Sequence, residues 1–287
     1  MGKTKVIVVT HKEFDDSKLT EGYQVVTVGP NAPHKEGWVH DNTGDNVAHE
    51  NPYYCELTAQ YWAWKNLPED VENVGLVHYR RYFMDYKVGS DNYWQDILSI
   101  QKAEQILEKY SIIVPIRSFK NSGSSILYRR KPIEKQDPNW LLIQKIINRD
   151  FPEEAAAFDK VIYGRTQVWC NMLITKRKYF DAYTRWIFDV LGKYDEELKL
   201  AGKERTPRVD GYLSELLILV WITAHIPSDK VYYCPMENNE DAPMIPYEVG
   251  GIAKIRRNLR AKHKKAYVRY RGIRTRIHIC KMIMKGQ

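Results

Sequence analysis

The sequence has few cysteines and no long apolar run. Its four cysteines, at positions 55, 170, 234 and 280 of 287 residues, form no C-x-x-C pair. This spacing argues against a disulfide scaffold or a zinc module and predicts free thiols in a reducing compartment. No apolar run approaches the roughly 18 residues that a membrane-spanning helix requires, and no secretory signal precedes the apolar residues 6–9. We therefore expect a cytoplasmic protein without a spanning helix.

Acidic residues are missing from the last part of the chain. Lys and Arg number 44 against 36 Asp and Glu, yet residues 251–287 hold thirteen of the basic residues and no acidic one. The first 250 residues are therefore mildly acidic. Basic and apolar residues interleave over 252–285, which predicts one or two amphipathic helices on an anionic membrane surface. Nucleic acid is the alternative partner, but the acidic body argues against it, so we expect no nucleic acid.

This shift in charge divides the chain. We expect one domain over residues 1–240, a linker over 241–251 and a basic, membrane-associating tail over 252–287. Apolar residues make up 44% of the sequence, enough for a single large core in the domain.

Short apolar runs alternate with stretches of helical spacing along the domain. Strands are predicted at 5–10, 23–30, 74–78, 111–115, 168–175 and 230–234, and helices at 51–67, 101–110, 139–149, 152–160, 179–191 and 211–225. The polar segments 31–52, 116–135 and 192–207 predict loops or connectors. Such alternation is typical of an α/β fold, here one Rossmann-like domain whose mostly parallel central sheet is covered on both faces.

The most informative stretch is VGLVHYRRYF at residues 74–83. An apolar run that reads as a buried strand leads directly into His78, Arg80 and Arg81. In α/β sheets, ligands bind beyond the carboxyl ends of the strands. Two arginines and a histidine there predict an anion site, most plausibly for a phosphate or diphosphate. The alternatives are a solvated basic turn, or an arginine that pairs with a buried acid such as Glu56.

Several segments together resemble one family. They are KVIVVTHK at 5–12, GDNVAHENPYYCELTAQYWAWKN at 44–66, VGLVHYRRYF at 74–83, NMLITKRKYFDAYTRWIFDVL at 171–191 and RVDGYLSELLILVW at 208–221. In order and spacing they resemble bacterial exopolysaccharide and capsular-polysaccharide glycosyltransferases, a group long catalogued as a domain of unknown function and later linked to galactofuranosyl and related transfer. The resemblance covers about residues 3–240. One departure is Leu216, which stands where the family pattern leads us to expect an arginine; Arg205 or Arg208 could supply that contact.

The resemblance implies a GT-A-like, nucleotide-sugar-binding domain and a UDP-sugar donor. Galactofuranose or galactose is the favoured hexosyl group. The implied acceptor is a lipid-linked oligosaccharide or a growing polysaccharide in capsule, exopolysaccharide or O-antigen synthesis. Together with the basic tail, this places the enzyme on the inner face of the bacterial plasma membrane.

The chain has no D-x-D motif, the carboxylate pair with which enzymes of this fold usually hold Mn²⁺ or Mg²⁺. Cationic side chains can stabilise a departing diphosphate instead. We therefore expect metal-independent stabilisation by Arg80 or Arg81, with His78 as a donor, and no required cofactor. The alternative is that His78 and a carboxylate bind Mn²⁺ or Mg²⁺.

Other donor contacts are expected from polar residues near strand and helix ends. The end of the first strand is a natural place for uridine or a phosphate. The candidates are Thr10, His11, Lys12, Asp45, Asn46, Lys65 and Asn171. The alternatives are a solvated turn for Thr10, His11 and Lys12, a helix cap for Asp45 and Asn46, and a turn asparagine for Asn171.

Two tryptophans are candidates for stacking on the sugar or the acceptor. Trp62 falls on the apolar face of the predicted 51–67 helix, so we expect it in the core. Trp64 faces another direction, and Trp169 lies beside Asn171.

The catalytic base that deprotonates the acceptor is expected to be a carboxylate. Asp210 is the first candidate and Glu215 the second. Asp210 stands where it could simply cap the 211–225 helix, whereas Glu215 is an acid within an otherwise apolar helix, which is costly unless it is paired or functional. The competing interpretation of the whole chain is a non-catalytic polyanion-binding protein with a basic tail.

Overall fold

The computed structural model describes residues 4–87, 93–119, 137–164, 166–168 and 170–239, and Lys262 alone beyond them. The predicted linker, the predicted tail apart from Lys262, and Trp169 lie outside these residues, so the predictions for them remain predictions.

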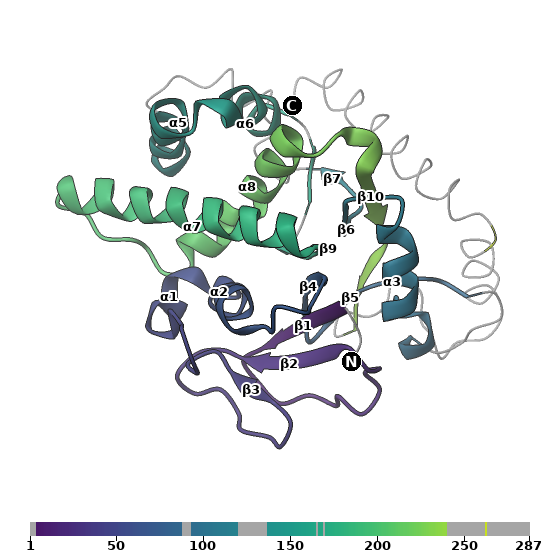
Figure 1. Cartoon of the computed structure of the whole chain (residues 1–287). Helices are drawn as coiled ribbons and strands as arrows, with labels where there is room; N and C mark the ends of the chain where they lie inside the picture. Colours follow the sequence, from purple (N-terminus) through teal and green to yellow (C-terminus); the bar gives the residue numbers. More distant parts are fainter. Residues whose placement is uncertain are drawn as a thin grey trace, which may run out of the picture.

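One mixed sheet forms the centre of the molecule (Figure 1). Its main path runs in the order β10-β6-β9-β4-β1-β2-β3. The strands are β1 (Thr4–Thr10), β2 (Tyr23–Thr27), β3 (Val39–His40), β4 (Asn73–His78), β6 (Ile112–Pro115), β9 (Leu173–Lys176) and β10 (Val231–Cys234). β9 is antiparallel to both of its neighbours, and the other six strands point the same way. The expected α/β fold with a mostly parallel sheet is therefore confirmed.

Two short antiparallel additions complete the strands. β5 (Arg81–Phe83) pairs with the end of β4 and with β11 (Met236–Asn238). β7 (Ser118–Phe119) and β8 (Thr166–Gln167) form a separate two-stranded sheet. The β4–β5 turn places Arg80 and Arg81 at the carboxyl end of a central strand, where the sequence predicts an anion site.

Helices cover the two faces of the sheet unequally. They are α1 (Asn51–Tyr54), α2 (Leu57–Asn66), α3 (Ile100–Leu107), α5 (Pro138–Asp150), α6 (Ala155–Ile162), α7 (Arg177–Leu200) and α8 (Val209–His225), with 3-10 turns at Ala48–Glu50, Trp94–Asp96, Pro152–Glu154 and Ser228–Lys230. Figure 1 shows α3 on one face and α7 on the other, with α8, α5 and α6 beyond it. α8 packs against α1, α6 and α7.

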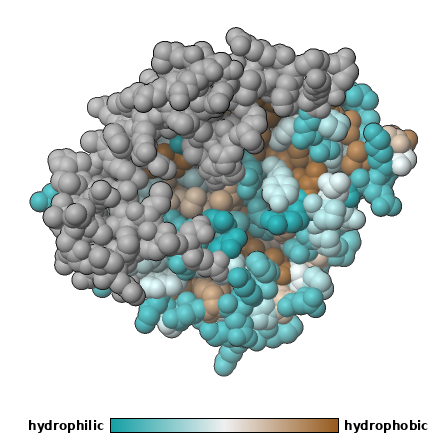
Figure 2. Space-filling view, turned by 180° about the vertical axis from the view of Figure 1, so that it is seen from behind, coloured by the Kyte–Doolittle hydropathy of each residue, from teal (hydrophilic) through white to brown (hydrophobic). Residues whose placement is uncertain are grey.

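The apolar strands supply side chains to two cores, one on each face. Along β1, Ile7 and Val9 pack beneath the large helical layer, whereas Val6 and Val8 pack beneath α3. All four are buried. Alternate side chains of a strand point to opposite faces, so a strand covered on both sides has no polar alternation. On the face seen in Figure 2, hydrophilic residues cover most of the described surface, and hydrophobic ones appear in separate patches.

Three boundaries differ from the sequence predictions. The predicted 51–67 helix is broken at Cys55, whose φ of 52° is not helical. The predicted 168–175 strand begins only at Leu173. α7 continues to Leu200 through the predicted connector, because Tyr194 and Leu198 keep its buried face apolar beyond Gly192. Within the described residues, no helix is both long and apolar enough to cross a membrane.

Candidate active site

A cavity of about 750 Å³ opens where β1 and β4 end. The α1–α2 junction and the start of α8 form its other walls. Seven of the residues predicted from the sequence line it together: Thr10, His11, Lys12, His78, Arg80, Arg81 and Glu215. Parallel strands end at a common edge of the sheet, and this edge is where α/β proteins bind their ligands.

Cationic groups outnumber carboxylates in this cavity. Lys12, Arg80, Arg81 and Arg208 line it, against Glu56 and Glu215. The Tyr79 ring is close to two of the cations: its centroid lies 5.4 Å from Lys12 Nζ and 5.7 Å from Arg80 Cζ. A ring face attracts cations, so Tyr79 helps to place both side chains. The excess of positive charge suits an anionic ligand such as a diphosphate.

His78 is fixed by one main-chain contact. Its Nε2 lies 2.6 Å from the carbonyl oxygen of Cys170. Because a carbonyl only accepts, Nε2 carries the hydrogen and donates it. Burial lowers the pKa of His78, although Glu56 and the Cys170 carbonyl oppose this shift, so the ring is neutral at pH 7. In that tautomer Nδ1 is an acceptor, which fits a contact with a hydroxyl rather than the expected donation to a phosphate.

Glu215 has the electrostatics of a base that works near neutral pH. Burial, and after it the nearby Glu56 carboxylate, raise the pKa of Glu215 to about 7. The main-chain N–H of Cys170 donates a hydrogen bond to it, and Arg81 and Arg208 also favour its charged form. A carboxylate with a pKa near the working pH can both take up and release a proton.

Asn171 shapes the cavity from behind. Its buried side-chain Nδ2 lies 2.7 Å from Glu56 Oε1, 2.7 Å from Ser214 Oγ and 3.1 Å from the Gly211 carbonyl oxygen. Asn171 is not among the residues that line the cavity. Asn171 therefore connects Glu56 to the start of α8. The start of α8 also lies close to Cys55, because a Cβ at Gly211 would lie 3.3 Å from Cys55 Cβ.

Unfavourable backbone conformations gather around this cavity. Among the described residues, the non-glycine residues with positive φ are Cys55, Cys170, Asn171 and Arg208. Three of them line the cavity and Asn171 lies directly behind it. Such conformations cost on the order of 1–3 kcal/mol each and persist where the surrounding structure imposes them, often at functional sites.

The structure draws Asp210 into a different cluster. Asp210 is fully buried and accepts from Arg205 at 2.9 Å, and the same guanidinium group contacts Asp195 at 2.9 Å and Glu50 at 2.5 Å. Burial raises the pKa of Asp210 to about 6. Asp210 does not line the cavity, so this arrangement favours Glu215 as the carboxylate that meets a substrate. Arg205 belongs to the ion cluster, whereas Arg208 lines the cavity.

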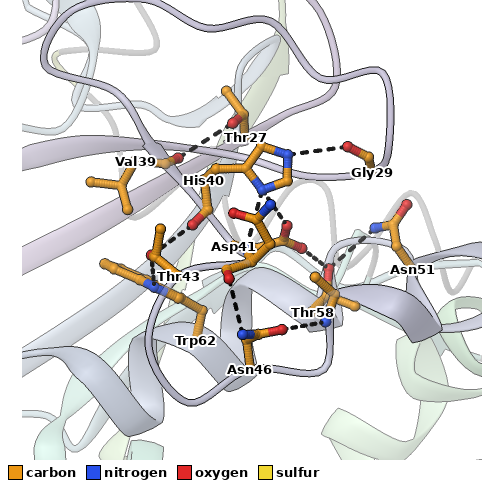
Figure 3. A network of polar contacts seen from close by, with 12 residues as sticks. Thr27, Gly29, Val39, His40, Asp41, Thr43, Asn46, Asn51, Thr58 and Trp62 are labelled. Carbon is orange, nitrogen blue, oxygen red and sulfur yellow. Dashed lines mark hydrogen bonds and ion pairs between the residues drawn. The ribbon is translucent and has the colours of Figure 1, made fainter.

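The loop that contains Asp45 and Asn46 is held by its own polar network (Figure 3). Asn46 Nδ2 donates to the carbonyl oxygen of Asn42 at 3.0 Å, and its Oδ1 accepts from the Ala48 N–H at 3.2 Å. Close by, Asp41 faces Thr58, which donates to it at 2.5 Å. These contacts order the loop before α1 without bringing Asn46 into the cavity.

Three more predicted residues lie together on α2 and the loop beside it. Asp45 Oδ1 accepts from Tyr61 at 3.2 Å, and Asp45 Oδ2 lies 4.0 Å from Lys65 Nζ. Lys65 Nζ lies 3.8 Å from the Trp64 ring centroid. Asp45, Trp64 and Lys65 are absent from the lining of the cavity, so the structure groups them with each other and not with the arginines.

Sequence reasoning did not single out several residues that line the cavity. Cys55, Cys170, Gly211 and Tyr212 are among them, and the sequence suggests Arg208 only as a replacement for an expected arginine. Among the residues that the structure describes, no three His, Cys, Asp or Glu side chains lie close enough together to hold a metal ion.

Comparisons with known proteins give one matching family and several structures with a related fold. The model of a family described as Domain of unknown function (DUF4422) matches residues 5–226. A comparison with curated proteins gave no match. The apo structure of the bifunctional glycosyltransferase WbbM matches 87% of this chain, with a TM-score of 0.68 and 22% identity. This likeness shows that the two chains share a fold. This chain covers 47% of that WbbM chain, about half of its length.

Two further structures are more distant. Core-mannan synthase A (CmsA/Ktr4) of Aspergillus fumigatus, in an Mn/GDP form, has a TM-score of 0.37 and 10% identity over 83% of this chain and 75% of its own. The S. cerevisiae mannosyltransferase Ktr4p has a TM-score of 0.29 and 9% identity over 67% of this chain and 62% of its own. Neither is similar enough to carry an argument about this site.

Proposed function

Because the chain belongs to the DUF4422 family and has the fold of the WbbM glycosyltransferase, we propose that it is a glycosyltransferase that uses a UDP-sugar. The transferred group is a hexosyl group, with galactofuranose or galactose favoured. The acceptor is a lipid-linked oligosaccharide or a growing polysaccharide in capsule, exopolysaccharide or O-antigen synthesis. The observation that carries the proposal is the joint lining of one cavity by four cationic side chains and by Glu215.

The diphosphate of the donor binds among these cations. Arg80 and Arg81 follow directly from the end of β4, and Lys12 follows from the end of β1. Guanidinium groups contact two phosphoryl oxygens at once, and such contacts strengthen as the leaving group gains charge. Thr10 and His11, at the end of β1, are the proposed neighbours of the uridine.

Glu215 takes the acceptor proton. The acceptor oxygen forms a bond to the anomeric carbon of the sugar while the bond from that carbon to the β-phosphate oxygen breaks. UDP leaves with the bonding electron pair, and the hydroxyl proton passes to the Glu215 carboxylate. With a pKa of about 7, about half of Glu215 is charged and ready to accept a proton at pH 7.

His78 and Glu56 orient the sugar in this proposal. The bare Nδ1 of His78 accepts from a sugar hydroxyl, because Nε2 is already committed to Cys170. Glu56, held by Asn171, is a second acceptor on the same wall. The Arg-based site supports turnover without a metal ion, and Mn²⁺ or Mg²⁺ remains the alternative.

The basic tail over residues 252–287, which lies outside the described residues apart from Lys262, is proposed to hold the enzyme against an anionic leaflet. Each Lys or Arg near such a surface contributes on the order of 1 kcal/mol, in a salt-dependent way. Flotation with phosphatidylglycerol vesicles, in competition with duplex DNA, tests this proposal. If the protein binds the DNA and does not float with the vesicles, the result would favour the polyanion-binding interpretation.

The proposed activity is tested by binding and by turnover. Thermal-shift measurements with UDP-galactofuranose, UDP-galactose, UDP-glucose and UDP-N-acetyl sugars should show stabilisation by at least one of them and by UDP. The preferred donor should then release UDP in the presence of a lipid-linked acceptor. A chain that gains no stability from any of these nucleotides would contradict the proposal.

A further inference from the structure

A second cavity, of about 410 Å³, lies on the other side of Glu215. The start of α5, the β8 strand, the segment before α8 and α8 itself surround it. Its lining includes Asn139, Trp140, Gln167, Thr206, Tyr212 and Glu215. Tyr212 and Glu215 line both cavities. They are three residues apart on α8, so their side chains lie on one face of the helix, and this face is the wall between the two spaces.

The two cavities differ in charge. Among the described residues, those that line the second cavity include no Lys or Arg, whereas four line the first. The second cavity instead combines two aromatic rings with amide and hydroxyl groups and with the carboxylates of Asp137 and Glu215. Among the described residues a phosphate would find no cation there, but an uncharged polyhydroxyl ligand would find apolar faces for its C–H groups and polar partners for its hydroxyls.

Tyr212 has no packing role that explains its position. It is 57% exposed, and it is one of two large apolar side chains exposed to this extent among the described residues; the other is Leu200 at 86%. The Arg208 guanidinium lies 5.2 Å from its ring centroid, so a residue of the first cavity contacts a ring that also lines the second. Trp140 is half-buried and packs against Phe158 at 6.4 Å, which fixes the opposite wall.

We propose that the second cavity binds the acceptor saccharide, with Trp140 and Tyr212 in contact with its sugar ring. This inference rests on the proposed function, because the saccharide is the acceptor only if the first cavity holds the donor. The shared wall then places an acceptor hydroxyl against Glu215 on one side while the anomeric carbon of the donor approaches from the other. The Glu215 carboxylate then reaches both substrates, because it lines both cavities.

Saturation-transfer NMR tests the site directly, with methyl β-D-galactopyranoside, methyl β-D-glucopyranoside and methyl α-D-mannopyranoside as probes at millimolar concentration. At least one probe should receive saturation from the wild-type protein. Trp140→Ala and Tyr212→Ala should reduce that transfer at least fivefold, while Tyr212→Phe, which keeps the ring, should retain it. Leu200→Ala is the matched control, because it removes the other exposed apolar side chain and lines neither cavity.

The outcomes separate this inference from the proposed function. Trp140 lines only the second cavity, so Trp140→Ala should leave the UDP affinity within about twofold of wild type. If Trp140→Ala unfolds, the exposed Tyr212 still provides the test. No saturation transfer to any probe, unchanged transfer in both alanine variants, or displacement of the probe by UDP would overturn the acceptor site while leaving donor binding intact. Saccharide binding without any UDP binding would instead overturn the proposed function.

Discussion

The main-chain N–H of Cys170 donates a hydrogen bond to the carboxylate of Glu215. The carbonyl oxygen of the same residue accepts from His78 Nε2 at 2.6 Å. Cys170, whose φ is 73°, therefore connects His78 at the end of β4 to Glu215 on α8. In the proposed reaction Glu215 meets both substrates and needs such support, because loosely held catalytic groups lose effective concentration.

Replacement of Glu215 by glutamine should abolish most of the turnover. The amide cannot take the acceptor proton, so we expect kcat to fall about 10²- to 10⁴-fold, which is the usual contribution of a general base. UDP affinity, measured by calorimetry, should change by less than about threefold, because glutamine keeps the volume of the side chain.

Asp210→Asn is the matched control for this variant. Asp210 faces Arg205 and not the cavity, so the asparagine enzyme should keep at least about a third of the wild-type kcat. The opposite pattern, with Asp210→Asn inactive and Glu215→Gln active, would identify Asp210 as the base.

The rate should rise with pH through neutrality. Because the pKa of Glu215 is raised to about 7, the carboxylate is mostly protonated below that pH and cannot accept the acceptor proton. We expect kcat/KM for the acceptor to rise about tenfold per pH unit between pH 5 and 6.5 and to level off above about pH 7.5. Burial lowers the pKa of His78 below its ordinary value, so this ring is already neutral at the pH where the rise levels off. A flat profile over this range, or one whose rise persists in Glu215→Gln, would contradict the assignment.

The sequence predicts the end of β4 well, because a fully buried strand has an unbroken apolar run. The run at residues 74–77 therefore marks where the strand lies, and the charged residues that follow it fall at the ligand-binding edge. The same argument places Thr10, His11 and Lys12. The placement of these residues at the edge of the sheet depends only on local sequence and on a general property of α/β sheets.

The remaining wall of the cavity depends on long-range packing. Cys55, Cys170 and Arg208 reach it through positive φ angles, and their residue types give no local signal for that conformation. The choice between Asp210 and Glu215 depends on how α8 is rotated, which the Gly211–Cys55 approach and the pairing of Arg205 decide. The helical spacing around Lys65 likewise predicts that its side chain points away from the core. It does not predict which side chain Lys65 contacts.

Removal of Arg80 or Arg81 should weaken donor binding. Each alanine variant loses charge-assisted hydrogen bonds that contribute about 1.5–3 kcal/mol, so we expect UDP to bind about 10- to 100-fold more weakly. The loss should shrink as salt is raised, because part of it is screened. Arg149→Ala is the control: Arg149 is an exposed arginine paired with Asp150 at 2.8 Å, and its removal should leave UDP affinity unchanged. Wild-type UDP affinity in both cavity variants would place the nucleotide elsewhere.

Loss of Arg205 should destabilise the protein. Its guanidinium group is the shared partner of Glu50, Asp195 and Asp210, so Arg205→Ala leaves three carboxylates together around a buried site. Breaking a buried ion pair in this way costs about 3–5 kcal/mol, which corresponds to a fall in Tm of roughly 10 °C.

The pH dependence of this loss follows from Asp210. Its native pKa of about 6 lies above that of an ordinary Asp, so it is charged at pH 8 and mostly protonated at pH 5. Calorimetric scans should therefore show a larger difference in Tm between wild type and Arg205→Ala at pH 8 than at pH 5. If the difference in Tm between wild type and Arg205→Ala is equal at both pH values, charge repulsion from Asp210 is not the cause of the destabilisation.

Chelation should leave the proposed transferase activity intact. Arg80 and Arg81 line the cavity at the strand end where a D-x-D motif would otherwise bind a divalent ion, and the sequence contains no such motif. A guanidinium group stabilises charge on a departing phosphate without any exchangeable ion. We expect turnover after EDTA treatment to stay within about twofold of the untreated enzyme, and added Mn²⁺ or Mg²⁺ to change it little. Complete loss on chelation with recovery in Mn²⁺ would show that the arginines act together with a metal ion, and His78→Ala would then be the variant that identifies a ligand.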